Sequence, residues 1–131
     1  MENKIYHIGK KQLESYLVDR GNRVKTVLLD FKHISSWREY GELMERELQF
    51  PRPIEGNTNR FLDWIRDLSW YHYDAYNIIF YNFKKLSTKN FRDAYKIYME
   101  FDQIVLPFWE HDAVRCIVDG KRKDFNVYIV E

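Results

Sequence analysis

Two aspartates, Asp63 and Asp67, are four residues apart in a segment with helical periodicity. On an α-helix this spacing places both carboxylates on one face, because residues four apart lie one turn from each other. Such a pair can act as general acid and base where the surroundings drive the two pKa values apart. Here Arg60 and Arg66 stand beside the aspartates, so we expect both acids to stay ionised. This favours a protein-binding face over catalysis, with an ordinary solvated face as the remaining interpretation.

Other residues capable of catalysis or metal binding are scattered. The four histidines show no metal-ligand spacing, and the single cysteine, Cys116, cannot build a structural zinc site. The five glycines form no phosphate-binding loop, and no Gly-x-Ser-x-Gly nucleophile motif is present. We therefore predict no metal, no cofactor and no catalytic residue. The alternative enzymatic hypothesis is a small nuclease that uses distant histidines among His33, His72 and His111.

The aspartates belong to a predicted helix that begins at Asn57 or Thr58, both good N-cap residues, and runs to about residue 68. Its apolar residues form a narrow stripe: Phe61, Ile65 and Leu68. Its polar residues cluster on the opposite side: Asn59, Asp63 and Arg66. Pro51 and Pro53 prevent the preceding helix from continuing and stiffen the loop between the two helices. The segment thus presents a rigid loop and a polar helix face to solvent.

Three further helices are predicted from periodicity. A short one covers residues 10–19. Another begins at Ser36, which has capping-box spacing to Glu39. The last begins at Ser87 or Thr88, places Asp102 on its apolar side, and ends or kinks at Pro107.

Strands are predicted where β-branched and aromatic residues gather, at residues 24–31, 77–83 and 125–130. Helical connections between strands require crossovers, so we predict an α/β fold with a small three-stranded, mainly parallel sheet packed by about four helices. Residues 116–118 are predicted to add an antiparallel edge strand. Residues 1–22 are interpreted as an N-terminal extension and residues 23–131 as the domain.

Charge and composition exclude several classes of function. Lys and Arg number 21 against 20 Asp and Glu, so the net charge of +1 indicates no nucleic-acid partner through bulk charge. No apolar run reaches the roughly 20 residues of a membrane helix, and no signal core is visible. A single cysteine is typical of a reducing compartment. We expect a cytoplasmic protein, most simply a monomer.

The loop and helix described above carry a family resemblance. A proline, a glycine and an asparagine precede acidic residues one turn apart, in the order Pro51, Gly56, Asn57, Asn59, Asp63 and Asp67. This pattern resembles barstar-like proteins, the intracellular inhibitors of barnase-type ribonucleases. The order of strands and helices extends the resemblance over roughly residues 23–131, and its specific part spans about twenty residues. The resemblance implies a small parallel sheet packed by helices.

The resemblance also implies an activity and a partner. It indicates an immunity protein of a toxin–antitoxin pair, which occludes the active site of a cognate ribonuclease toxin with the 52–59 loop and the following helix. The residues expected to contact this partner are Arg52, Ile54, Glu55, Asn57, Asn59, Asp63, Trp64, Arg66, Asp67, Trp70 and Glu100. Asn59 is neutral where the family has a second key acid, and Arg66 offsets Asp63. An adaptor whose partner is not a nuclease is the alternative.

Overall fold

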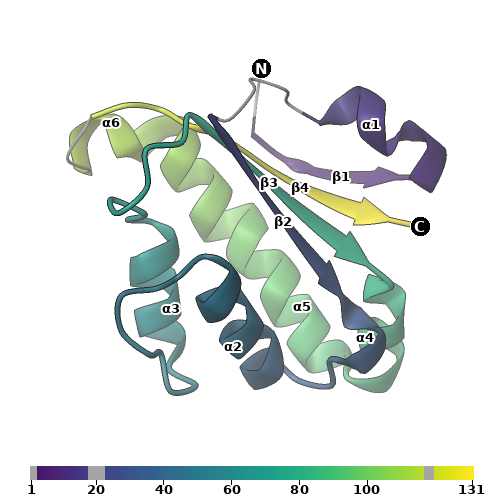
Figure 1. The fold of residues 1–131 in the computed structure, drawn as a ribbon. Helices are drawn as coiled ribbons and strands as arrows, with labels where there is room; N and C mark the ends of the chain where they lie inside the picture. Colours follow the sequence, from purple (N-terminus) through teal and green to yellow (C-terminus); the bar gives the residue numbers. More distant parts are fainter. Residues whose placement is uncertain (1–2, 18–22, 117–119) are drawn as a thin grey trace.

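The computed structural model describes residues 3–17, 23–116 and 120–131 and shows an α/β fold built on one parallel sheet (Figure 1). The sheet has the strand order β1-β4-β3-β2, and every pairing is parallel. The strands are β1 (Ile5–Ile8), β2 (Val24–Asp30), β3 (Ala75–Tyr81) and β4 (Asp124–Val130). In the two central strands, all residues except Tyr81 and Asp124 are buried. Burial on both faces explains why these strands read as continuous apolar runs. The three predicted strands and the parallel α/β class are confirmed.

A fourth strand exists, but its predicted position is wrong. Cys116 is the last residue of helix α6 (Ala113–Cys116), and the rest of the predicted 116–118 strand lies outside the described residues. The additional edge strand is β1, which runs parallel to β4 with Ile5 opposite Val127. β1 is only four residues long, which is too short for its residue pattern to predict a strand without knowledge of its neighbour β4.

Helices cover the two faces of the sheet unequally. Figure 1 shows α2, α3 and α5 on one side, α1 on the other, and α4 at the carboxyl end of β3. Their bounds are α1 (Leu13–Tyr16), α2 (Trp37–Glu47), α3 (Thr58–Ile65), α4 (Phe83–Lys89) and α5 (Phe91–Glu100). Ser36 is confirmed as an N-cap, since its hydroxyl accepts a hydrogen bond from the backbone N–H of Glu39 at 3.1 Å. None of the helices in the described ranges is both long enough and apolar enough to span a bilayer.

The start predicted for the last long helix is wrong. Ser87 and Thr88 lie inside α4, and α5 is capped instead by Asn90, whose side chain accepts a hydrogen bond from the N–H of Asp93 at 3.2 Å. The break between α4 and α5 was missed because asparagine is as common in turns as at helix N-caps, so Asn90 did not stand out as a cap.

Pro107 does not end this helix. Helical structure continues through two π-helical segments, η3 (Phe101–Val105) and η4 (Phe108–Asp112), into α6. A proline disrupts an ordinary α-helix through its missing N–H and its clash with the carbonyl four residues earlier, and wider π turns relieve both. The side of this helix that faces the core carries Ala94, Ile97, Phe101 and Val105. Asp102, which the sequence places on the apolar side, is exposed together with Tyr95, so the core-facing side was predicted wrongly.

The main core contains a buried hydroxyl whose removal should stabilise the fold. Tyr40 is fully buried against aromatic rings of Phe31, Trp37, Phe61 and Phe80. Among the described residues, its hydroxyl oxygen has no hydrogen-bond partner. Because an unsatisfied buried polar group costs about 1–3 kcal/mol, we expect Tyr40→Phe to raise the free energy of unfolding by roughly 1 kcal/mol in urea titrations. A lower free energy of unfolding for Tyr40→Phe would contradict this expectation.

Candidate functional site

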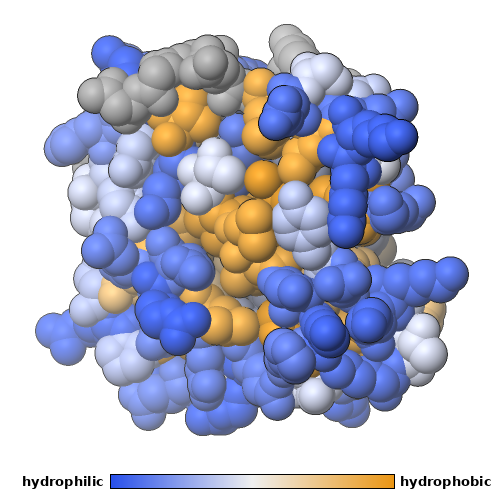
Figure 2. All heavy atoms as spheres, turned by 45° about the vertical axis from the view of Figure 1, so that its right-hand side comes forward, coloured by the Kyte–Doolittle hydropathy of each residue, from blue (hydrophilic) through white to orange (hydrophobic). Residues whose placement is uncertain are grey.

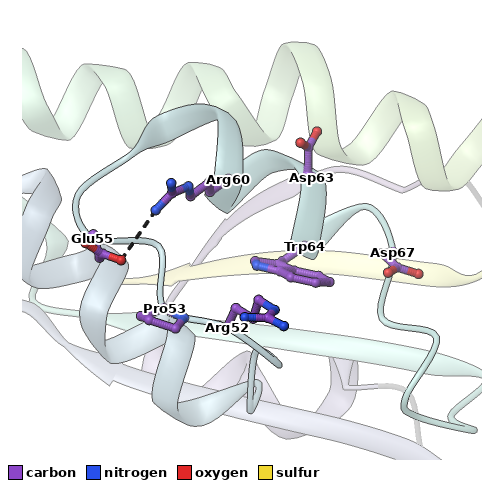
Figure 3. A pocket seen from close by; sticks show the side chains of 7 residues that line it. All are labelled: Arg52, Pro53, Glu55, Arg60, Asp63, Trp64 and Asp67. Carbon is purple, nitrogen blue, oxygen red and sulfur yellow. Dashed lines mark ion pairs between the residues drawn. The ribbon is translucent and has the colours of Figure 1, made fainter.

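The loop before α3 and the exposed side of α3 enclose a pocket of about 510 Å³ (Figure 3). Its lining residues come from the loop, the helix and the turn after it: Arg52, Pro53, Glu55, Arg60, Asp63, Trp64 and Asp67. Figure 3 shows the Trp64 ring above Arg52 of the loop, with Asp67 to one side and the Asp63 carboxylate pointing away from the ring. On the other side, Arg60 and Glu55 form an ion pair at 3.5 Å. The pocket thus combines two cations, three carboxylates and one aromatic ring. The pocket can receive a partner's charged side chain against a flat apolar surface.

The loop is fixed from beneath. Ile54 is fully buried, and its N–H donates to the Glu45 carboxylate at 2.7 Å. Glu55 and Gly56 follow with left-handed backbone angles, φ 51° and φ 72°. A Cβ at Gly56 would meet only the end of the exposed Arg38 side chain, so glycine is favoured there by its backbone conformation. Glu55 holds a conformation that non-glycine residues rarely adopt, which is typical of functional loops.

The first turn of α3 is tied to its neighbours. The Asn57 side chain accepts a hydrogen bond from the N–H of Arg60 at 3.0 Å, which confirms the predicted cap. Lys96 of α5 donates both to the Thr58 hydroxyl and to the Glu100 carboxylate, each at 2.7 Å. The Lys96 ammonium also lies 4.5 Å from the Trp37 ring centroid. These contacts fix the position of α3 relative to α5 and α2.

Glu100 serves inside this network and not on the surface. Its side chain is 8% exposed, and its second oxygen accepts a hydrogen bond from the Trp37 indole N–H at 2.7 Å. The resemblance placed Glu100 among the partner-contacting residues, because this helix adds an outer acidic contact in the family. Both carboxylate oxygens are engaged within the fold, so we assign Glu100 a positioning role.

Lys96→Met tests this network. The substitution leaves the buried Glu100 carboxylate without its cation, which destabilises a fold by several kcal/mol when both partners are fully buried. The Lys96 side chain is 36% exposed, so solvent reduces the penalty. We expect the free energy of unfolding to fall by about 1–2 kcal/mol in urea titrations. Lys96→Met/Glu100→Gln should recover part of the loss, and a double variant no more stable than Lys96→Met would contradict the pairing.

The end of α3 separates the two aspartates. The helix ends at Ile65, three residues earlier than predicted, and Leu68 has a left-handed φ of 53°. Asp67 therefore lies in the following turn, where its carboxylate accepts a hydrogen bond from the N–H of Ser69 at 3.3 Å. The predicted pairing of both carboxylates on one helix face is wrong, although both line the pocket.

Asp63 is the most exposed of the three acidic residues that line the pocket. Its side chain is 76% exposed, and it forms an ion pair with the Arg66 guanidinium at 3.4 Å. The Arg66 Nε also donates to the Leu62 carbonyl at 3.0 Å, so the guanidinium is folded back along its own helix. An exposed pair of this length contributes little to stability. Asp63 is thus available to an incoming cation.

An aromatic pair supports the pocket from one side. The rings of Trp64 and Trp70 meet edge to face with centroids 5.6 Å apart, and both side chains are partly buried. The Trp70 indole N–H donates to the Leu48 carbonyl at 2.9 Å. Trp64 therefore presents a ring whose orientation is restrained before any partner arrives, as expected of an interface anchor.

The structure places the sequence-predicted residues in three groups. Those lining the pocket are Arg52, Glu55, Asp63, Trp64 and Asp67. Those exposed or partly exposed beside it are Asn57, Asn59, Arg66 and Trp70. Those buried are Ile54 and Glu100. The sequence reasoning missed Pro53 and Arg60 as lining residues, although Arg60 lies three residues before Asp63, a spacing that puts both on neighbouring parts of a helix surface.

The histidines proposed for a nuclease do not meet. His33 follows the carboxyl end of β2, whereas His72 precedes the amino end of the neighbouring parallel strand β3. Seven-residue strands separate these ends by about 23 Å. His111 lies on η4. In the described residues, no group of three or more His, Cys, Asp or Glu side chains could hold a metal ion.

Comparison with known proteins assigns the fold to a family. The family model described as Barstar (barnase inhibitor) matches residues 24–121. The chain belongs to this Barstar family. The match begins at the first residue of β2 and includes the whole pocket. It ends before β4, and it leaves out β1 and α1.

A solved structure shares the fold of this Barstar family member over most of its length. The structure of the Aeropyrum pernix ORC2 protein in ADPNP–ADP complexes aligns with a TM-score of 0.58 and 16% sequence identity. The alignment covers 98% of this chain and 34% of that chain, so this chain spans about a third of that protein's length. At this identity the likeness shows the fold alone. No curated protein sequence matches the chain.

Proposed function

We propose that this Barstar family member inhibits a cognate ribonuclease toxin by covering its active site with the 52–59 loop and α3. The observation that carries the proposal is the pocket of about 510 Å³, which lies on the loop and helix of a chain matched by the Barstar (barnase inhibitor) model. Inhibition would be steric and would require no reaction and no cofactor. An immunity protein with this role would act in the cytoplasm of the cell that makes the toxin, as a monomer.

The electrostatics of the pocket support a ribonuclease as partner. Ribonuclease sites hold phosphate with cationic groups, and Asp63 offers an exposed carboxylate in place of phosphate. Asp67 supplies a second carboxylate on the same pocket wall. Arg52 and Arg60 reduce the negative charge, and Asn59 brings none. The partner should therefore present an excess of cations together with an acidic group that meets the arginines, which gives selectivity through charge complementarity.

Paired affinity capture tests the proposal. The wild-type chain, Asp63→Arg and Glu14→Arg would each be used to capture proteins from lysate and culture fluid of the source organism. Glu14 is an exposed carboxylate on α1 and provides a matched charge reversal away from the pocket. We expect wild type and Glu14→Arg to retain a small nuclease that Asp63→Arg loses, and the purified nuclease to lose RNA cleavage on adding wild type.

The alternative is an adaptor with a partner that is not a nuclease. The mixed charge of the pocket and the neutral Asn59 favour this candidate over a close copy of an acidic inhibitor. Capture of one non-nuclease partner by wild type, lost with Asp63→Arg, would support the adaptor and replace the inhibitor. Equal capture by all three chains would place the interaction outside the pocket.

A further inference from the structure

A cluster of cationic residues, the basic corner, lies at the carboxyl ends of β2 and β3. Its members are all exposed: Lys32, His33, Lys84, Lys85, Lys89 and Arg92. The Lys89 ammonium donates to the Lys32 carbonyl at 3.5 Å, and the Asn82 amide donates to Asp30 at 2.8 Å. These bonds join α4 to the segment that follows β2. Figure 1 places α4 at the opposite end of the helical layer from α3, so the basic corner is distinct from the pocket.

The positive charge of the basic corner is available to a partner. Residues 82–92 contain four cations and no acid, although Arg92 forms an ion pair with Asp93 at 3.2 Å. Within the described parts of the chain, none of the four lysines of the basic corner forms an ion pair. Nearby acids are already hydrogen-bonded to backbone N–H groups: Asp30 to Lys32, Glu39 to Ser35, and Asp93 to Trp37. The lower part of the face in Figure 2, which brings this side forward, is almost entirely hydrophilic.

Two exposed aromatic residues lie on the first two turns of α5, which begins two residues after Lys89 ends α4. Phe91 and Tyr95 are one turn apart and are 67% and 55% exposed. Their ring centroids lie 6.1 Å apart, with planes inclined by 29°. A single exposed aromatic residue is ordinary, but two mutually stacked rings beside unpaired lysines match the combination that single-stranded nucleic acids require. Cations hold the phosphates, and the rings offer flat surfaces for bases.

We propose that the basic corner and the Phe91–Tyr95 pair bind single-stranded nucleic acid. Lysine contacts to phosphate release counterions and supply the affinity, and stacking selects single strands whose bases are accessible. The net charge of +1 indicated no such partner. A net charge summed over the whole chain does not show that five of the 21 Lys and Arg residues lie in the basic corner. This site is independent of ribonuclease inhibition, since it shares no residue with the pocket.

Fluorescence anisotropy with labelled RNA and DNA single strands of about 12 nucleotides tests the proposal. We expect saturable binding at about 50 mM salt, weakened linearly with the logarithm of salt concentration. Lys85→Glu/Lys89→Glu should weaken binding at least about tenfold and lower the salt slope by about 2. The matched variant Lys10→Glu/Lys11→Glu reverses two exposed lysines on η1 and should bind with little change.

The aromatic pair separates nucleic acid from other polyanions. Phe91→Ala/Tyr95→Ala should weaken oligonucleotide binding about tenfold and leave binding of heparin, which has no bases, unchanged. Circular dichroism would establish that every variant is folded. Absence of saturable binding, equal losses with both lysine variants, or oligonucleotide binding unaffected by Phe91→Ala/Tyr95→Ala would each overturn the proposal.

Discussion

Asp63→Arg should abolish inhibition of the cognate ribonuclease and leave the fold intact. The Asp63 carboxylate is 76% exposed and pairs with a partly exposed arginine at 3.4 Å, so its replacement should change the free energy of unfolding by less than about 1 kcal/mol. In a complex, the same change would place a guanidinium against the cations of a phosphate-binding site. Like-charge contacts at an interface cost several kcal/mol, which corresponds to a loss of affinity of at least about 100-fold.

Inhibition assays at several salt concentrations would measure this loss, with Glu14→Arg as the control for net charge. The change should appear in both rate constants, because charge at an interface steers association and a buried like-charge contact speeds dissociation. Thermal unfolding of the isolated variant must remain close to that of wild type. Full inhibition by a folded Asp63→Arg would mean that α3 does not enter the active site, and the pocket would then lose its assigned role.

Local sequence patterns predicted correctly those features that depend only on residues within one helix or strand. The caps at Ser36 and Asn57 are confirmed by their hydrogen bonds, because capping depends only on residues within one turn. The two central strands are confirmed because buried parallel strands require continuous apolar runs, and the edge strand β2 is confirmed because it is rich in valine and leucine. The π turns around Pro107, by contrast, could not be predicted from the sequence, because hydrophobic periodicity does not reveal the tertiary packing that offsets their cost.

The candidate site shows the same division. Residue type and spacing correctly drew attention to the loop and α3, five of whose predicted residues line the pocket. The burial of Glu100 could not be predicted, because it depends on Lys96 and Trp37 reaching it from positions fixed by helix packing. The break in α3 before Asp67 was equally hidden, since a left-handed Leu68 is stabilised by burial and not by propensity. Geometry between elements therefore decided which predicted residues stay on the surface.

Another large effect on stability is expected where Asn3, just before β1, is hydrogen-bonded to the segment that leads into β4. Asn3 is buried, and its side-chain oxygen accepts hydrogen bonds from Arg122 and from the N–H of Phe125, both at 3.1 Å. Its own N–H donates to the Glu110 carboxylate at 2.7 Å, and Glu110 in turn pairs with Arg122. These bonds anchor β1 beside β4, although the family match begins only at residue 24. The N-terminal segment is therefore hydrogen-bonded into the same sheet.

Glu110→Gln should weaken this anchor in a pH-dependent way. The Arg122 guanidinium and the Asn3 N–H lower the pKa of Glu110 from 4.5 to about 2. A carboxylate with a lowered pKa stabilises the fold fully above its ordinary pKa and loses that contribution as pH falls from 4.5 toward 2. The shift corresponds to roughly 3 kcal/mol near neutral pH. We expect Glu110→Gln to reduce the free energy of unfolding by about 2–3 kcal/mol near pH 7.

Urea titrations of wild type and Glu110→Gln at about pH 7 and about pH 3 distinguish the effect of losing the charge from the effect of altered packing. Glutamine retains nearly the volume of glutamate, so a packing defect would cost the same at both pH values. An ionic contribution instead requires the difference between the two proteins to shrink at the lower pH, where Glu110 is already largely protonated in the unfolded chain. Glu14→Gln, which alters an exposed carboxylate on α1, should match wild type at both pH values. A difference independent of pH would show that the charge of Glu110 does not hold the N-terminal strand in place.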